Sequence, residues 1–518
     1  MTLINDEDFL YSREELKFRE FAREFVEGEI QPIAKDVERT PFPEKDWRAL
    51  MRKMGKEGYT GIMIPPEYGG MGKSLMYQLL AGEEISAESP ALTMGFGASC
   101  TLSAIPILRF GSEEQKQKYL VPLAKGETIG ALAITEPNVG SDTAGMETKA
   151  VWDEKEQVWI LNGEKRFITN GSIADQIVTF AITDPSVDSK SGMSAFIIES
   201  NWEGFSVIKD YDLMGRRGVR NTHFKIVDMR VPPENMLGRQ NQGFLILMDE
   251  LDTERVGIAA ESLGCMRKPF EVAVEHSMNR VQFGRPISRF EGISFKIADM
   301  ATLMRAARLM TVTAARMIEQ SKPATKEATM AKLFSTEAAV KVTDMAIQIL
   351  GGEGYVKDYS GIEKFYRDSR LGTIGGGTSE IMRFLIQREV YIEQKRGKVP
   401  LGVPAIEIDF STLMASIPKG FRPDRAEGVK AQIQFEFSDG DHWLLDIHDQ
   451  QCHVEKGMSK EALMTVTTDS ETWKSIMLGQ MDAMQAMMAG KVNITTEDME
   501  LLMKFARMFK FTPETFIN

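Results

Sequence analysis

Several residue types and sequence features are scarce or absent in this chain of 518 residues, and each shortage excludes a class of protein. The three cysteines, Cys100, Cys265 and Cys452, show no CxxC spacing. We therefore expect neither a disulfide framework nor a zinc site, and a reducing compartment is favoured. The five histidines also lack metal-ligand spacing, so no bound metal is predicted.

Long apolar runs and basic clusters are missing as well. No stretch of eighteen apolar residues occurs, so no membrane span is expected. The acidic N-terminus lacks the apolar segment of a secretory signal and the arginines of a transit peptide, which predicts a cytoplasmic protein. The net charge is -13 and no basic stripe is visible, which argues against nucleic-acid binding.

What the chain does contain predicts a multidomain α and β protein. Hydrophobic residues make up 43% and charged residues 26%, as in globular proteins with several cores. Phe18, Phe21 and Phe25 have the spacing of one helix face. Short runs of alternating apolar and polar residues, joined by polar turns, come next, and long segments with apolar residues at helical spacing follow them. The expected parts are a helical domain over 1–126, a β-domain over 127–240, a helical domain over 241–395, a Pro/Gly-rich linker over 396–404 and an α+β unit over 405–518.

Four short motifs could approach a ligand closely. "AITEPNVGSD" (133–142) ends in a turn whose hydroxyls and backbone N–H groups could bond a polar ring edge or a phosphate. "RFITNGS" (166–172) offers similar groups, and either motif could equally be an ordinary turn. "GGEGYV" (351–356) and "IGGGTSE" (374–380) are glycine loops without the Gly-Lys-Ser/Thr of a P-loop.

One acidic residue lies on an apolar helix stripe. Leu247, Leu251, Glu254 and Ile258 are separated by four, three and four residues, which places them on one helix face. Glutamate is rarely buried without a partner. Two interpretations follow from the spacing: an ion pair with Arg255 or another neighbour at the rim of the packing, or a general base whose pKa an apolar pocket raises.

Five motifs, in this order, resemble those of the acyl-CoA dehydrogenases: "AITEPNVGSD", "FITNG", "NRVQFGRPI", "AIQILGGEGY" and "GGGTSEIMR". The resemblance covers about residues 5–395. It implies a helical N-domain, a β-barrel-like middle domain and a four-helix-bundle C-domain. It also implies one FAD per subunit, a homo-oligomer (tetramer or dimer), an acyl-CoA substrate and an electron-transferring flavoprotein as electron acceptor.

The same resemblance implies cofactor contacts in all five motifs. Phe167 would lie beside the flavin, and the Thr169 hydroxyl would lie near the reactive nitrogen. Residues of the third and fourth motifs would hold the FAD of a neighbouring subunit, although Gln282 replaces a hydroxyl residue of some members. The residues expected at the cofactor are Leu132, Ile134, Thr135, Gly140, Ser141, Phe167, Thr169, Arg280, Gln282, Phe283, Gln348, Gly352, Thr378 and Glu380.

The catalytic base is where the chain departs from the commonest family pattern. Many members carry a glutamate within "YEGT", where this chain has Gly375 and Gly376. A minority of members, including isovaleryl- and long-chain-type enzymes, carry it within "LDxER", which matches "LDTER" here. Glu254 is therefore expected to remove the α-proton, and the Gly376 N–H to polarise the thioester. The residues expected at the substrate are Ser141, Leu251, Asp252, Arg255, Gly375 and Gly377.

The C-terminal unit resembles the sterol carrier protein type 2 domain in "GDHWLLDIHDQQCHVEKG" and "MQAMMAGKVNITTEDMELLMKF". The resemblance implies a five-stranded sheet with helices around a lipid tunnel, and binding of fatty acyl-CoAs and other lipids. The last helical segments are rich in methionine, which suits adaptable apolar cavities and equally suits ordinary core filling.

The predicted function is dehydrogenation of an acyl-CoA to a trans-2-enoyl-CoA, with the hydride passing to the flavin. Two alternatives stay open: an oxygen-using acyl-CoA oxidase or monooxygenase-like flavoprotein, and a non-catalytic flavin or lipid carrier. Retention of an acid at Glu254 argues against the second alternative.

Overall fold

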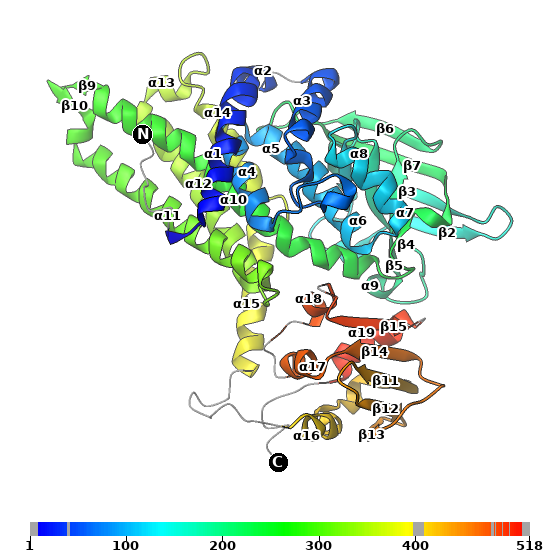
Figure 1. The fold of residues 1–518 in the computed structure, drawn as a ribbon. Coiled ribbons are helices and arrows are strands. Elements are labelled where there is room, and N and C mark those ends of the chain that lie inside the picture. Colours follow the sequence, from blue (N-terminus) through cyan, green and yellow to red (C-terminus); the bar gives the residue numbers. More distant parts are fainter. Residues whose placement is uncertain are drawn as a thin grey trace. The chain divides into compact units, whose positions relative to one another are not determined.

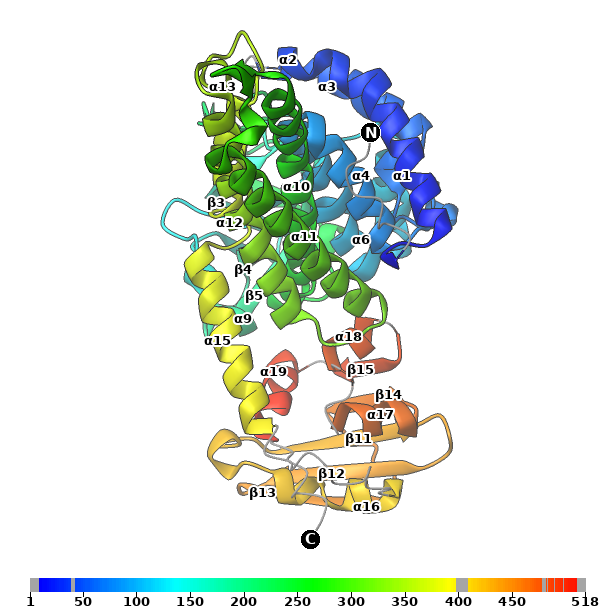
Figure 2. The ribbon, with the colours of Figure 1, turned by 90° about the vertical axis from the view of Figure 1, so that its left-hand side faces the viewer.

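A computed structural model gives the fold as two compact units, each described by itself below (Figures 1 and 2). The first unit holds the chain up to Ile386 apart from 317–324, and the second holds 317–324 and the chain from Gln387 onward. The expected linker lies outside the described residues, except for Arg396 at its start. The described residues are 9–38, 42–396, 409–477, 481, 483–488, 490–496 and 498–509.

The N-terminal part of the first unit is helical, as predicted. A capping box starts α1, because Ser12 Oγ accepts the Glu15 N–H and the Glu15 carboxylate accepts the Ser12 N–H. The expected core stripe of this helix is only partly correct. Phe18 is buried, whereas Phe21 is 37% exposed and stacks on the buried ring of Tyr59. The helices are α1 (Arg13–Phe25), α2 (Ala34–Val37), α3 (Glu44–Lys56), α4 (Leu75–Glu88), α5 (Pro90–Gly97), α6 (Ala104–Phe110), α7 (Glu113–Gln115) and α8 (Val121–Ala124).

Within the described residues, one stretch, Pro90–Phe110, is long and apolar enough to cross a membrane by length and composition alone. The sequence analysis did not single it out. In the structure 72% of its most apolar window is buried inside the protein, as in the core helix of a globular fold.

The middle part is an eight-stranded sheet in the order β6-β7-β3-β2-β4-β5-β8, with β1 beside β4. β2 and β3 form an antiparallel hairpin that closes with Asp153 opposite Val158, as expected of alternating runs joined by a polar turn. Near its end β3 has an irregular register against β7, between Lys165 and Ile168. The strands are β1 (Gly130–Ala133), β2 (Lys149–Asp153), β3 (Val158–Thr169), β4 (Gln176–Ile182), β5 (Met193–Glu199), β6 (Phe205–Asp210), β7 (Asn221–Val231) and β8 (Met236–Leu237), with the short α9 (Ser189–Gly192) before β5.

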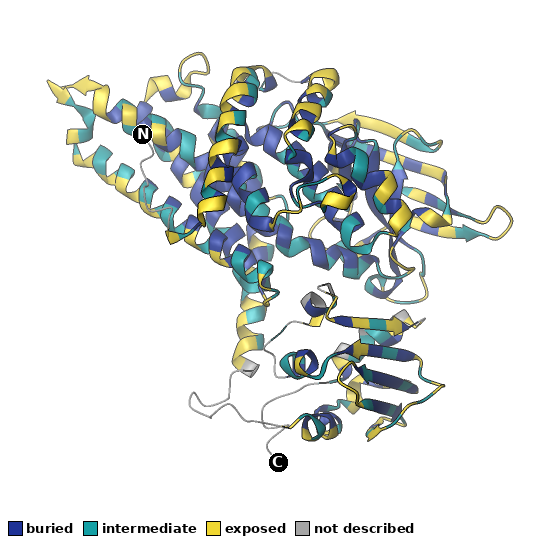
Figure 3. Ribbon diagram, in the orientation of Figure 1, coloured by how far each residue is buried: buried dark blue, intermediate teal, exposed yellow. Residues whose placement is uncertain are grey.

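Long helices complete the first unit, with α10 packed between α4 and α12. Their facing sides are buried and their outer sides exposed (Figure 3). α12 ends just before the glycine pair at 351–352, where Gly351 has φ +60°. The elements are α10 (Gly243–Asn279), β9 (Val281–Gln282), β10 (Arg285–Pro286), α11 (Glu291–Glu319), α12 (Thr325–Leu350), α13 (Gly352–Tyr355), α14 (Glu363–Gly372) and α15 (Ser379–Arg396), the last of which runs into the second unit.

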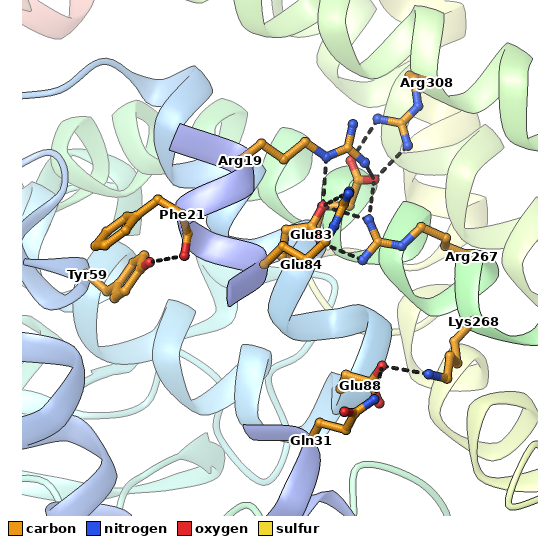
Figure 4. Close-up of polar contacts among 11 residues, drawn as sticks. Arg19, Phe21, Gln31, Tyr59, Glu83, Glu84, Glu88, Arg267, Lys268 and Arg308 are labelled. Carbon is orange, nitrogen blue, oxygen red and sulfur yellow. Dashed lines mark hydrogen bonds and ion pairs between the residues drawn. The ribbon is translucent and has the colours of Figure 1, made fainter. Parts of the chain in front are cut away.

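A buried ionic cluster joins four helices of this unit (Figure 4). Glu83 on α4 receives both terminal nitrogens of Arg308 from α11, at 2.6 and 2.8 Å. Glu84 receives both terminal nitrogens of Arg267 from α10, at 2.6 and 2.7 Å. Arg19 from α1 bridges the two carboxylates at 2.7 and 2.8 Å. Every charge in this cluster therefore has a partner of opposite sign.

The second unit contains the predicted five-stranded sheet, in the order β13-β12-β11-β14-β15. Asp449 and Gln450 adopt positive φ in the turn between β12 and β13. Met477 is buried in the core, and Met481 and Met487 pack against it, so these three methionines fill the core. The elements are α16 (Phe410–Ala415), β11 (Ala431–Phe437), β12 (His442–His448), β13 (Gln451–Lys456), β14 (Met464–Thr468), α17 (Ser470–Met477), α18 (Ala483–Met488), β15 (Val492–Thr496) and α19 (Met499–Met508).

Candidate active site

Glu254 and the glycine turn meet in the first unit, although 122 positions separate them in the chain. Gly376 has φ +61°, and a Cβ built there would overlap Ile258 Cδ1 and lie 3.3 Å from Glu254 Oε1. Gly377 follows at φ +91°. A side chain at position 376 would therefore enter the space that Glu254 and Ile258 occupy, so glycine is required there on two grounds, space and backbone conformation.

The expected partner of Glu254 is engaged elsewhere. Arg255 Nη1 donates to Asp252 Oδ1 at 2.7 Å, and Asp252 Oδ2 accepts from the Thr325 hydroxyl at 2.6 Å. In the described part of the chain Glu254 makes no ion pair within 4.0 Å. Burial raises the pKa of the Glu254 carboxyl, while the positive charges of Arg255 and Lys332 oppose the rise. These features match the general-base interpretation better than the rim ion pair.

A second acid, which the sequence analysis missed, lies one turn before Glu254. Glu250 is 2% exposed, and neither of its carboxyl oxygens has a hydrogen-bond partner. Burial raises its pKa well above the ordinary value, Arg109 opposes the rise, and Asp249 and Glu254 add to it. Asp249 itself pairs with Arg109 at 2.7 Å. The spacing of four residues from Glu250 to Glu254 was the available sequence signal.

A lysine from α12 also reaches the glycine turn and was likewise missed. Lys332 is fully buried, and its Nζ donates to the Gly377 carbonyl at 2.5 Å. Burial lowers its pKa to about 8, and the charge of Glu254 partly opposes that shift. The available signal in the sequence was the position of Lys332 among small residues of a core-facing helix stripe, since lysine is rarely buried without a partner.

The first and second cofactor motifs lie side by side. The Arg166 N–H donates to the Thr135 carbonyl at 2.8 Å, which joins the end of β3 to the loop after β1. Phe167 lies in the irregular segment of β3 at φ +61° and is 49% exposed. Its ring contacts the Arg166 guanidinium, 4.5 Å away, and Tyr211, whose ring centroid is 5.0 Å away. Irregular strand ends of this kind redirect side chains, and here the result is an exposed aromatic face.

The remaining residues of these two motifs surround that face or lie on the adjoining turn. Leu132 belongs to β1, opposite Val178. Leu132, Ile134, Thr135 and Thr169 are partly exposed, whereas Gly140 and Ser141 are exposed on the turn.

A buried ion pair holds the loop of the first motif in place. Lys165 Nζ donates to Glu136 Oε1 at 2.8 Å and to the Ile134 carbonyl at 3.3 Å. The Glu136 carboxylate also accepts the backbone N–H groups of Glu147 and Thr148, at 2.6 and 3.1 Å. Burial opposes ionisation, yet Lys165 and these bonds lower the pKa of Glu136. The glutamate of "ITEPNVG" thus shapes the loop and does not contact the glycine turn.

The third and fourth motifs lie far from Glu254 in the same subunit. Arg280 follows Glu254 by 26 residues along α10, which corresponds to about 39 Å of helix. Phe283, on the β9–β10 hairpin, has φ +51° and is 94% exposed. Gln282, Gln348 and Gly352 are exposed as well. A single subunit does not bring these residues to the glycine turn.

Thr378 caps the start of α15. Its Oγ1 accepts the Ile381 N–H at 3.3 Å, which makes Thr378 the N-cap of this helix. Ser379 Oγ is buried without a hydrogen-bond partner, whereas Glu380 is exposed. Among the described residues, no group of three or more His, Cys, Asp or Glu side chains could hold a metal ion.

Comparison with known proteins gives the family. Residues 12–127, 131–229 and 241–391 match the N-terminal, middle and C-terminal domains of acyl-CoA dehydrogenases, and residues 410–510 match the SCP-2 sterol transfer family. An acyl-CoA dehydrogenase of Bacillus subtilis is 43% identical over 378 residues, which are 73% of this chain and 98% of that protein.

Solved structures agree with the sequence matches. Butyryl-CoA dehydrogenase of Megasphaera elsdenii superposes with a TM-score of 0.70 at 36% identity, covering 74% of this chain and 99% of that one. A Bacillus anthracis acyl-CoA dehydrogenase complexed with FAD gives a TM-score of 0.71 at 30% identity, over 77% of this chain and 70% of that one. The chain therefore belongs to the acyl-CoA dehydrogenase family and carries an additional SCP-2 unit at its C-terminal end.

Proposed function

We propose that this protein is an FAD-dependent acyl-CoA dehydrogenase that converts an acyl-CoA thioester to a trans-2-enoyl-CoA, with Glu254 as the base. The observation that carries the proposal is the contact between Glu254 and the Gly376 turn. It places a carboxylate whose pKa is raised by burial beside a backbone segment that carries no side chain. That arrangement suits removal of a proton from the carbon next to a thioester carbonyl.

The residues of the turn and of α10 have separate tasks in this proposal. The Glu254 carboxylate accepts the α-proton, and burial makes it a stronger base than an exposed glutamate. In the part of the chain that the structure describes, the Gly376 N–H donates no hydrogen bond, so it is available to the thioester oxygen. Leu251, Gly375 and Gly377 would line the acyl group. Asp252 and Arg255 would contact substrate from the side of α10, together with Ser141 of the first motif.

The residues fit the cofactor of the family. The exposed face of Phe167 and the partly exposed Thr135 and Thr169 offer an apolar surface with hydroxyls at its edge, as a flavin ring needs. Bound FAD supplies the acceptor for the hydride that leaves the β-carbon. Leu132 and Ile134 would lie along the ring and Gly140 and Ser141 beyond it, and Thr378 and Glu380 would meet the adenosine portion.

A second copy of the chain completes the proposed cofactor site. Arg280, Phe283, Gln348 and their neighbours are too far along the bundle to reach the site of their own subunit. Phe283 exposes almost its whole ring, which a partner subunit would cover. We propose a homo-oligomer, a dimer or tetramer, in which Gln282 and Gly352 also approach the partner's FAD.

The test is anaerobic bleaching of the bound flavin by a panel of acyl-CoAs of different length and branching. We expect rapid bleaching by at least one of them and little peroxide in air. Abundant peroxide would favour the oxidase alternative, and absence of bleaching by every acyl-CoA would contradict the proposal. The matched control for a Glu254 variant is Glu271→Gln, an exposed glutamate on the same helix.

We further propose that the SCP-2 unit binds hydrophobic acyl-CoAs and raises their concentration near the active site. The Bacillus subtilis relative aligns with this chain over 98% of its own length but over only 73% of this one, which supports treating the first unit as complete. We propose domain boundaries near 126, 240 and 395. Removal of residues 400–518 should raise KM for long substrates and leave KM for short ones unchanged, and equal effects would contradict the delivery role.

An electron-transferring flavoprotein is the electron acceptor that we propose, in the cytoplasm. The buried, unpaired thiols of Cys100, Cys265 and Cys452 suit a reducing compartment. Purified electron-transferring flavoprotein should reoxidise the substrate-reduced enzyme faster than oxygen does.

A further inference from the structure

Lys332 is a buried charge in contact with the candidate active site. It lies on α12, has no exposed surface, and bonds the Gly377 carbonyl at 2.5 Å. In the described ranges no carboxylate lies within 4.0 Å of its ammonium group, although Glu254 is the largest of the charges that favour ionisation. Lysine is almost never fully buried unless it is paired, so the position costs stability and needs an explanation.

The hydrogen bond of Lys332 acts on the turn that must face the thioester. Gly376 and Gly377 have φ of +61° and +91°, a backbone with many accessible alternatives when no side chains restrain it. A donor from α12 to the Gly377 carbonyl restrains the Gly377–Thr378 peptide, two peptide units after the one that carries the Gly376 N–H. Because oxyanion donors work only when they are held in place, this bond matters for the reaction as well as for folding.

The charge of Lys332 acts on Glu254. On α10, Arg255 is bonded to Asp252, and the charge of Glu254 raises the pKa of Glu250. From α6, Arg109 is paired with Asp249. Glu337 on α12 and Glu380 on α15 affect Lys332 more weakly than Glu254 does. Lys332 is therefore the cation near Glu254 that has no acid of its own within ion-pair distance among the described residues.

We propose that Lys332 is a positioning residue for dehydrogenation: it fixes the Gly376–Gly377 turn through the Gly377 carbonyl and adds its positive charge to that of Arg255 near Glu254. The inference rests on the proposed function of Glu254. It predicts that removal of the ammonium group impairs the chemical step without preventing folding, because a buried charge is removed together with its desolvation cost.

The first experiment measures the pH dependence of flavin bleaching in the full-length holoenzyme of Lys332→Met. We expect the bleaching rate at pH 7 to fall at least about tenfold, with KM for the acyl-CoA changed less than kcat. Glu254 must lose its proton to act, so the bleaching rate should fall at low pH and give the pH–rate profile an acidic limb. Removal of a nearby positive charge should move this acidic limb to higher pH by about one unit. Lys332→Arg, which keeps the charge, should leave the limb within a fraction of a unit of wild type.

The matched control is Lys364→Met. Lys364 is also a largely buried lysine with a lowered pKa, but it donates to the Glu88 carbonyl and is affected by Asp368, Glu38 and Glu88 instead of Glu254. Its substitution should leave the acidic limb in place. If Lys332→Met and Lys364→Met give the same limb as wild type, the positioning role is wrong, even when rates fall.

The second experiment needs no catalysis: thermal unfolding of the flavin-free protein as a function of pH. The pKa of Lys332, about 8, lies below its ordinary value of 10.5, so the unfolded state binds more protons between these two values. Wild type should therefore gain stability relative to Lys332→Met as pH rises from about 8 toward 10.5, and the variant should melt no lower than wild type at pH 7.

A large drop in Tm at pH 7 together with an unchanged acidic limb would show a purely structural lysine and overturn the inference. If wild type is not bleached by any acyl-CoA, the proposed function fails instead. The pH dependence of the melting difference then still decides whether Lys332 is a buried charge of the kind described. Should Lys332→Met fail to fold, Lys332→Gln, which keeps a donor for the Gly377 carbonyl, takes its place with the same expected limb shift.

Discussion

Two pairs of glutamates in the first unit have opposite proton affinities. On α4, burial would raise the pKa of Glu83, but Arg308 and Arg19 outweigh it and lower that pKa to about 2. The pKa of Glu84 is lowered as well, with Arg267 as the main favourable charge. On α10, burial dominates, and the pKa values of Glu250 and Glu254 are raised. Burial alone therefore does not decide whether these glutamates are ionised. The positively charged side chains beside them decide it.

The difference separates acids that hold helices together from acids that are available to react. The α4 pair is saturated by guanidinium groups from three other helices, so neither carboxylate can accept a further proton at neutral pH. On α10, neither carboxyl oxygen of Glu250 has a hydrogen-bond partner, and Glu254 lies against the backbone of the glycine turn at Gly376. Perturbed acids with few partners are typical of functional sites.

The largest expected effect is on turnover. Glu254→Gln keeps the shape of the side chain but removes the base, and we expect flavin bleaching to slow by about 10²–10⁴-fold with FAD content unchanged. Glu271→Gln should behave as wild type. Full-rate bleaching of Glu254→Gln would show that the base lies elsewhere, and the contrast between the two glutamate pairs would lose its functional meaning.

The next largest effect is expected on the free energy of unfolding, through the ion pairs of Glu83 and Glu84. Arg308→Met leaves the Glu83 carboxylate buried with one cation fewer, and breaking a buried ion pair in this way costs about 3–5 kcal/mol. Chemical denaturation at pH 7 measures the loss. Arg383→Met, which breaks the exposed Arg383–Glu337 pair at 2.7 Å, is the control and should cost less than about 1 kcal/mol. Similar losses for both variants would contradict the structural role of the cluster.

A smaller effect is expected at the glycine turn. Gly376→Ala places a methyl group against Ile258 Cδ1 and 3.3 Å from Glu254 Oε1, on a backbone at φ +61°. The unfavourable conformation alone costs about 1–2 kcal/mol. We expect a raised KM and slower bleaching, whereas Gly292→Ala, at an open helical position, should alter neither. Unchanged kinetics in Gly376→Ala would place the thioester elsewhere.

The smallest effect on turnover is expected for Glu250→Gln, because burial raises the pKa of this acid and the amide keeps the shape of its protonated form. Its folded-state pKa lies above the ordinary 4.5, so its contribution to stability is complete below about pH 4.5 and is lost as pH rises. Glu83 behaves oppositely, since its contribution is complete above 4.5 and is lost as pH falls toward about 2. Glu250→Gln should therefore gain stability relative to wild type as pH rises above 4.5, as measured by denaturation at several pH values. A loss would mean that Glu250 is ionised and paired.

Much of the fold was predictable because it depends on local periodicity. The hairpin closed by Asp153 and Val158, the end of α12 at Gly351 and the Thr378 N-cap follow from residue spacing and turn chemistry. The core stripe of α1 was predicted only in part, because spacing does not show which edge of a helix its neighbours leave open. Phe21 lies on that open edge.

The site was predictable where a motif carried it and not elsewhere. Glu254 was selected by its position on a helix stripe and by "LDTER", and the structure places it against the Gly376 turn, which the sequence could only suggest. Lys332 and Glu250 were missed, because a charged residue in a helical stripe has the same spacing whether it faces solvent or a neighbouring helix.

The sequence by itself determined the helices and strands, the family motifs and the candidate base, because these depend on residues close in the chain or on recognisable patterns. Only the tertiary structure decided which acidic side chains lie beside arginine or lysine side chains. Lys332 meets Gly377 across 45 positions, and Arg308 meets Glu83 across 225. Contacts over such separations are created by packing of whole helices. Since the proton affinity of a buried acid depends on those contacts, the reactive state of Glu254 is a property of the fold.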